Sequence, residues 1–337
     1  MNKITKMGVS ALCGSLAAVS AANAGGMTVA GSANATWTSL DGSVTGNPLG
    51  MTTGLTFTGS GELDNGNAIT VNIAHDDKNV YSASDISLDI AGIGKLTFDQ
   101  GGGTGLDRLD DKMPTAWEES FDTGVGAGIQ TVTGVGGGTD IEWAISGDYM
   151  PDGMSAYVAW SPKADGSANS DKSVSGATTD GAVTGSGYDI VLEHSGLMDG
   201  LNVFAGYSEI DQAARIGDRT AKAIGATYAW GSFTAGYQYS KDTNPGVDGI
   251  TAAYYENNAF GLTFAVNDNL SVSYGEHESQ QQDFANAVTA TSQSLQIAYS
   301  MGGATIKVAE SEVENASYSS ATANDKEGRT IALTLAF

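Results

Sequence analysis

Hydrophobic and polar residues alternate along most of the chain after residue 24. Between Met51 and Leu63, for example, Leu55 and Phe57 are separated by the polar Thr56. Alternation with a period of two is typical of β-strands that are apolar on one face and polar on the other. We find sixteen such segments, so the sequence predicts an all-β protein.

The connections between these segments alternate in length. Tight turns such as 64–66 and 267–269 are built on Asn, Asp and Gly, which tolerate positive φ. They alternate with longer polar loops, of which 163–183 is an example. Short turns on one side and long loops on the other are typical of outer-membrane barrels. A closed barrel is also the strand architecture that leaves no backbone group unpaired in lipid.

Aromatic residues lie at the ends of several segments, as expected for the girdles at the two membrane interfaces. They are Trp37, Tyr149, Trp160, Tyr207, Tyr228 and Trp230. The fold predicted is therefore a 16-stranded antiparallel transmembrane β-barrel. A secreted β-sandwich or β-helix is the alternative, but it does not predict the alternation of short and long connections.

One segment, residues 100–137, has no periodicity and follows the short alternating run Lys95–Asp99. A structureless insertion of this length in a compact chain is usually functional. It is rich in glycine and carries six acidic residues: Asp107, Asp110, Asp111, Glu118, Glu119 and Asp122. We predict that this third long loop folds into the barrel lumen as the constriction of a pore.

The first 24 residues have the pattern of a secretory signal peptide, with Lys3 and Lys6 before an apolar stretch and Ala22-Asn23-Ala24 as a cleavage site. The mature barrel would then span residues 25–337. Its formal charge would be −26, because 15 basic residues minus the 2 in the signal leave 13 against 39 acidic ones. The single cysteine, Cys13, lies in the signal, and Leu12–Ser15 resembles a lipoprotein cleavage site, which is the alternative interpretation.

The negative charge disfavours binding to nucleic acid. No run of 18 apolar residues follows residue 24, so no transmembrane helix is expected. The sequence contains neither a G-x-S-x-G hydrolase turn nor an HExxH metal motif. We therefore expect no enzymatic activity.

With the strands counted, the chain resembles the 16-stranded general diffusion porins of Gram-negative outer membranes, closest in character to the alphaproteobacterial ones. The resemblance rests on the signal, the strand count, the long third loop and the final strand Thr330–Phe337. It implies location in the bacterial outer membrane, passive diffusion of small hydrophilic solutes and ions, and a homotrimer. An alternating last strand that ends in Phe337 resembles the signal read by the outer-membrane assembly machinery. Asp99 stands where such porins commonly have glycine.

The six loop acids are expected to create a negative potential in a narrow lumen and so to favour cations. By strand parity, the inward-facing basic wall residues are Lys95 and Lys307. The inward-facing acidic ones are Asp85, Asp89, Asp140 and Glu142. We expect a weak transverse field and a preference for cations. A solvated loop over the barrel mouth is the alternative placement.

No cofactor is required by this function. Hard cations prefer several carboxylate oxygens, so Asp107, Asp110 and Asp111 are a candidate calcium site. Glu310, Glu312 and Glu314 are a second candidate, on one strand face in phase with lipid-facing residues, where Ca²⁺ could bridge to lipopolysaccharide phosphates. A porin specific for one nutrient class, or an adhesin-like surface barrel, are the alternative functions.

Overall fold

The computed structural model describes residues 24–41, 46–77, 82–145, 149–164, 184–212, 217–245, 253–284 and 287–337. The predicted signal segment lies outside these ranges apart from Ala24. The strands are β1 (Ala24–Leu40), β2 (Leu49–Glu62), β3 (Ala68–Asp76), β4 (Ala83–Ile90), β5 (Gly94–Asp99), β6 (Asp140–Ile145), β7 (Met154–Ser161), β8 (Gly187–His194), β9 (Leu201–Ile210), β10 (Arg219–Trp230), β11 (Phe233–Thr243), β12 (Tyr254–Asn267), β13 (Leu270–Gln282), β14 (Thr289–Met301), β15 (Ala304–Glu314) and β16 (Lys326–Ala336).

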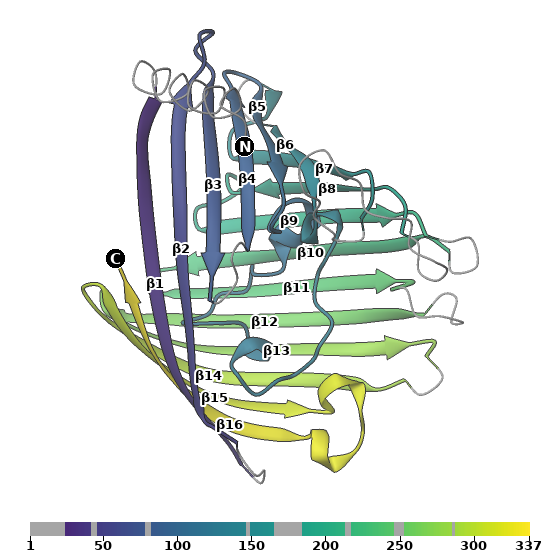
Figure 1. Ribbon diagram of the computed structural model, residues 1–337. Helices are drawn as coiled ribbons and strands as arrows, with labels where there is room; N and C mark the ends of the chain where they lie inside the picture. The colour runs from purple at the N-terminus through teal and green to yellow at the C-terminus, as the bar shows by residue number, and fades with distance from the viewer. Residues whose placement is uncertain are drawn as a thin grey trace, which may run out of the picture.

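These strands form one closed antiparallel barrel in which each strand pairs with its sequence neighbours (Figure 1). Closure is made by β1 and β16, in a register that runs from Ser32 opposite Ala336 to Leu40 opposite Gly328. The predicted 16-stranded antiparallel barrel is confirmed. The seam leaves no free sheet edge, which satisfies the backbone without solvent.

The strands differ widely in length. β1 has 17 residues, whereas β5 and β6 have only 6 each. β5 and β6 are short because the chain leaves the wall after Asp99 and rejoins it at Asp140. Within the described ranges, short 3₁₀ helices lie in the connections: η1 (Gly105–Leu109), η2 (Ser120–Asp122), η3 (Val135–Gly137), η5 (Ala316–Tyr318) and η6 (Thr322–Asn324).

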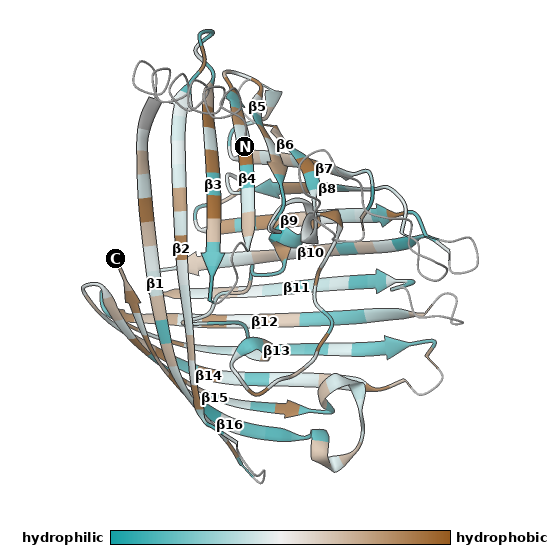
Figure 2. Cartoon of the chain, viewed as in Figure 1, coloured by the Kyte–Doolittle hydropathy of each residue, from teal (hydrophilic) through white to brown (hydrophobic). Residues whose placement is uncertain are grey.

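The barrel is apolar outside and polar inside, the reverse of a water-soluble protein. On β14, Leu295 and Ile297 are 58% and 44% exposed, whereas Gln296 between them is 1% exposed. The same alternation is visible along the strands in Figure 2, where hydrophilic residues also gather at the loop ends of β11 to β13. An apolar outer band with a polar interior is the pattern of a barrel that faces lipid. Among the described residues, no helix is long and apolar enough to cross a membrane.

Candidate functional site: the loop between β5 and β6

The chain turns away from the barrel wall directly after β5. The carboxylate of Asp99, the last residue of β5, accepts hydrogen bonds from the backbone N–H groups of Gly101 and Gly102, each at 2.8 Å. This cap satisfies the first backbone donors that the end of the strand leaves unpaired. Residues 100–139 then form one long excursion, which we call the lumen loop and which contains η1, η2 and η3.

An apolar patch on the inner wall holds the first part of the lumen loop. Leu106 and Leu109 of η1 are fully buried. They belong to one cluster with Met113 and Val132 of the loop and with Val191, Phe204, Ala221, Ala223 and Ala259 of the wall. The barrel interior is therefore not polar throughout, because β8, β9, β10 and β12 supply a hydrophobic seat for the loop.

Further along, hydrogen bonds fix the lumen loop to β13, β14 and β15. The backbone N–H of Ala116 donates to Ser273 Oγ at 2.9 Å, and Thr115 Oγ1 donates to Gln296 Oε1 at 2.8 Å. Two hydroxyl pairs, Ser120 with Ser292 at 2.8 Å and Thr123 with Ser311 at 2.6 Å, continue the series.

These wall residues alternate with the exposed apolar residues of the same strands, so they point into the barrel. The lumen loop consequently lies on the inner side of the wall. Figure 1 shows it running inside the ring of strands toward β13 and β14.

Asp189 of β8 joins the outgoing and returning parts of the lumen loop. Its buried carboxylate accepts hydrogen bonds from Leu106 N at 2.7 Å and from Val135 N at 3.1 Å. Gly105 has φ +51° and no room for a side chain, because Asp189 lies against the position of its Cβ. The alternating pattern of β8 indicates that Asp189 faces inward, but nothing local in the sequence shows that it binds the loop.

Asp140 and Glu142 lie on the inward face of β6, but the lumen loop covers them and they do not face an open channel. They are 1% and 4% exposed. Asp140 Oδ1 accepts from Thr104 Oγ1 at 2.7 Å, while Glu142 accepts from Gly105 N and forms an ion pair with Arg108. Because the lumen loop needs acceptors for its own donors, these carboxylates anchor it instead of contributing free charge.

The other predicted wall residues lie on the inward parity of their strands. Asp85 accepts two hydrogen bonds from Asn72 Nδ2, at 3.1 and 2.9 Å. Asp89 is paired in register with Lys95, and both are exposed. Lys307 of β15 lies 5.6 Å from the centre of the Trp117 ring on the lumen loop.

The six acidic residues of the lumen loop are close enough to influence one another. Burial, followed by the negative charge of Asp111, raises the pKa of Glu119 to about 8 and that of Asp110 to about 7. Burial also raises the pKa of Asp107, Glu118 and Asp122, with charge repulsion from acidic neighbours adding to it. The negative charge of Asp111 contributes to all five shifts, and Asp111 itself is exposed. The structure therefore brings the six predicted residues into one electrostatic cluster.

Two further inward-facing basic residues were not expected from the sequence. Arg219 of β10 forms an ion pair with Asp242 at 2.6 Å and donates to Thr133 Oγ1 at 2.8 Å, and Lys326 of β16 donates to Gly126 O at 2.7 Å. The prediction that Lys95 and Lys307 are the inward basic residues is thus incomplete. Both missed residues begin a strand next to a polar loop, where sequence parity is hardest to assign.

The wall of β1, β2 and β3 is different in character. These strands contain no lysine or arginine, and their inward positions are rich in hydroxyl and amide side chains. Examples are Thr36, Thr38, Thr56, Thr58 and Asn72. The lumen loop approaches this wall at Gly124, which lies near Thr38, and at Val125 and Ala127, whose cluster packs against Leu40.

In the part of the chain that the structure describes, no three His, Cys, Asp or Glu side chains are grouped so that they could hold a metal ion. Asp107, Asp110 and Asp111 are neighbours without converging on one point. On the outer face, Glu310 forms an ion pair with Arg329 at 2.7 Å, and Glu312 and Glu314 are exposed.

Comparison with known proteins agrees with this architecture. A family model described as Gram-negative porin matches residues 8–331. Among solved structures, a Salmonella typhi OmpF complex with daunomycin is 14% identical, with 92% of this chain and 97% of that chain covered and a TM-score of 0.67. An anion-selective porin from Comamonas acidovorans is 13% identical, with 93% and 99% covered and a TM-score of 0.67. A mutant of Rh. blastica porin is 16% identical, with 93% and 100% covered and a TM-score of 0.58.

Among curated proteins, none matches this sequence. The structural similarities, all at low identity, show the fold, whereas the family model matches nearly the whole chain. Together with the closed 16-stranded barrel and its apolar exterior, they lead to one conclusion. The chain belongs to the Gram-negative porins, outer-membrane barrels that act as channels for passive diffusion and not as enzymes.

Proposed function

We propose that this porin is a cation-preferring diffusion channel for small hydrophilic solutes and ions, and that the lumen loop forms its constriction. The observation that carries the proposal is the distribution of charge across the lumen. Six acidic side chains gather on the loop around Asp111, and β1 to β3 contain no lysine or arginine to oppose them.

Charge of one sign in a narrow aqueous path with low-dielectric walls raises the local concentration of counter-ions. Three basic residues at the loop are engaged in ion pairs, whereas Lys307 lies near Trp117 and Glu118. Arg108 pairs with Glu142, Lys112 pairs with Glu193 at 2.8 Å, and Arg219 pairs with Asp242. The charge that remains unpaired on the loop is therefore negative, which supports a preference for cations.

The test is the reversal potential of the purified protein in a planar bilayer under a KCl gradient. We expect a potential of cation-selective sign, reduced in Asp111→Asn because that substitution removes the charge shared by the cluster. Glu312→Gln is the matched control, since it removes a carboxylate from the exposed outer face of β15 and should leave the potential unchanged. Anion selectivity, or equal potentials for wild type and Asp111→Asn, would contradict the proposal.

The partners implied by the resemblance are proposals of the same kind. They are a homotrimer, contact with lipopolysaccharide and delivery by the assembly machinery through Phe337. An alphaproteobacterial relationship and calcium at Asp107, Asp110 and Asp111 or at Glu310, Glu312 and Glu314 also stay predictions. Conductance steps that occur in threes would support the trimer, and a loss of thermal stability in a chelator would support bound calcium.

A further inference from the structure

Two lysines interrupt an acidic belt on the outer surface of the barrel. Above the apolar band, on the side of the long loops, outward-facing positions of β12, β13, β15 and β16 are mostly glutamates. They are Glu256, Glu276, Glu278, Glu310, Glu312, Glu314 and Glu327. At the corresponding place on β10 and β11 the outward residues are Lys222 and Lys241. In a chain with a formal net charge of −24, this is an unusual concentration of positive charge.

Lys222 and Lys241 are directly opposite each other in the register of β10 and β11. Like charges in directly opposite positions destabilise a sheet unless something compensates them. Lys222 is exposed and makes no ion pair with any described residue, whereas Lys241 Nζ lies 3.3 Å from the centre of the Tyr254 ring. An anion bound between the two ammonium groups would remove the repulsion.

Among the described residues, the neighbouring acidic side chains form no ion pair with either lysine. Glu256 is opposite Lys241 in the register of β11 and β12. Its carboxylate accepts a hydrogen bond from Tyr239 Oη at 2.8 Å, and within the described ranges it forms no ion pair with Lys241. Glu209 on β9 is similarly engaged by Tyr207 Oη at 2.7 Å.

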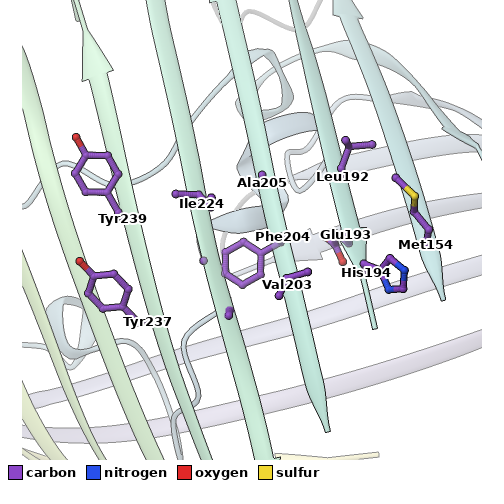
Figure 3. Close-up of a pocket in the computed structure, with 12 residues that line it drawn as sticks. Met154, Leu192, Glu193, His194, Val203, Phe204, Ala205, Ile224, Tyr237 and Tyr239 are labelled. Atoms are coloured by element: carbon purple, nitrogen blue, oxygen red, sulfur yellow. The ribbon is translucent and has the colours of Figure 1, made fainter. Parts of the chain in front are cut away.

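An apolar groove of about 540 Å³ lies next to the two lysines on the same outer face. Small residues, Ala205 and Ala226, form its floor between Leu192 on one side and Tyr237 and Tyr239 on the other, as Figure 3 shows for the labelled side chains. Ile224, also in the lining, follows Lys222 by two residues. The groove therefore begins about 7 Å along the strand from the positive charges.

We propose that the outer face of β8 to β11 binds one phosphorylated, acylated lipid of the outer leaflet. Its phosphate would lie between Lys222 and Lys241, and one acyl chain would occupy the groove. Lysine is a common phosphate ligand, and basic sites at the membrane surface recognise anionic lipid headgroups. The lysines lie on the side of the long loops, which in barrels of this kind is the extracellular side. The inference rests on family membership and is independent of ion selectivity.

The test uses the full-length porin in detergent, with bis-phosphorylated lipid A as the probe and native mass spectrometry to count bound lipid. We expect Lys222→Gln/Lys241→Gln to weaken binding about tenfold or more, as loss of a charge-assisted contact predicts. Arg329→Gln is the control, because it removes another outward-facing positive charge, on β16, and should bind like wild type. Heat-dependent migration on gels confirms that each variant is folded.

Four outcomes separate the parts of the proposal. Ala226→Phe, which fills the groove, should weaken lipid A binding while leaving conductance unchanged. Lipid A lacking its phosphates should bind no better to wild type than to the double lysine variant. Equal binding of lipid A by wild type and the double lysine variant would overturn the proposal. Complete displacement of lipid A by inorganic phosphate would also overturn it, because the site would then be one for the free anion.

Discussion

Asp111 is the acidic residue whose charge acts on all the other acidic residues of the lumen loop. It is exposed, yet its charge contributes to the raised pKa of the five other acidic residues, after burial as the larger cause in each. Because Asp110 and Glu119 have pKa values of about 7 and about 8, the charge of the lumen loop is not constant near neutral pH.

Cation selectivity should consequently rise between about pH 6 and about pH 9, as Asp110 and Glu119 ionise. The free energy of unfolding should change in the opposite direction, falling as the pH rises. Both pKa values are raised in the folded state, so their contribution is fully present below the unfolded pKa and is lost as pH rises through about 7 and about 8. Reversal potentials recorded across this range test the first effect. In Glu119→Gln the rise should be smaller, and a pH-independent wild type would show that these carboxyls do not face the ion path.

Asp189 fixes the lumen loop at both ends, so its charge is structural. An amide in its place has one acceptor oxygen and one NH2 donor, so it cannot accept from the donors around both carboxylate oxygens, among them the N–H groups of Leu106 and Val135. We expect Asp189→Asn to destabilise the folded protein by about 1–3 kcal/mol. Thermal unfolding followed by gel migration measures this, with Asp199→Asn in an exposed turn as the control. Equal melting of the two variants would exclude the anchoring role.

At the scale of elements, strands could be predicted from the sequence because their pattern is local. On β8, Tyr188 and Ile190 face outward while Asp189 faces inward, and this alternation is read directly from neighbouring residues. The inward direction of Val191 could not be predicted from the alternating pattern. Its apolar neighbours give a continuous apolar run, and its inward side chain packs on the loop, a contact between segments far apart in the sequence.

The path of the lumen loop could not be predicted from the sequence either, because it depends on contacts between segments far apart in the chain. Its acidic composition and length indicate a functional insertion, but its seat depends on residues from many different strands, from β6 to β16. The contacts of Ser273 and Gln296 with residues 115–118 require a closed barrel before they exist. Sequence parity identified Asp140 and Glu142 as inward-facing, whereas only the fold reveals that they are buried against the loop.

Leu109 tests how much of the loop's position depends on apolar packing. It is fully buried against the inner wall, and Leu109→Ala should cost about 2–5 kcal/mol through lost burial and the cavity left behind. Hydrogen exchange of the loop amides should become faster, while the strand amides keep their protection. Leu197→Ala, at a 62% exposed position in a turn, is the control. Unchanged exchange in Leu109→Ala would mean that the hydrogen bonds alone hold the loop.

At the scale of the whole molecule, the barrel depends on one seam between its first and last strands. The terminal residue takes part directly: Gly31 N donates to Phe337 O at 2.8 Å, and Phe337 N donates to Gly31 O at 2.9 Å. The Phe337 ring lies over Gly31, where a Cβ would come within 2.7 Å of its Cζ atom and 3.0 Å of Leu55 Cδ2. Absence of a side chain at residue 31 is therefore what lets the C-terminal aromatic ring cover the seam.

A larger residue at this position should interfere with closure of the barrel. Gly31→Val adds a branched side chain where the ring lies, so the ring or the strand must move, and we expect slower refolding in detergent and a lower melting temperature. Gly59→Val on the neighbouring β2 is a close match, since it also faces outward but has no atom within 4 Å of the added Cβ. The refolding rates of the two variants, followed by the change in gel migration, test whether a side chain at residue 31 slows closure of the barrel. If Gly31→Val refolds as fast as Gly59→Val, the contact between Gly31 and Phe337 is not needed to close the barrel, and any requirement for Phe337 in cells would lie in recognition by the assembly machinery.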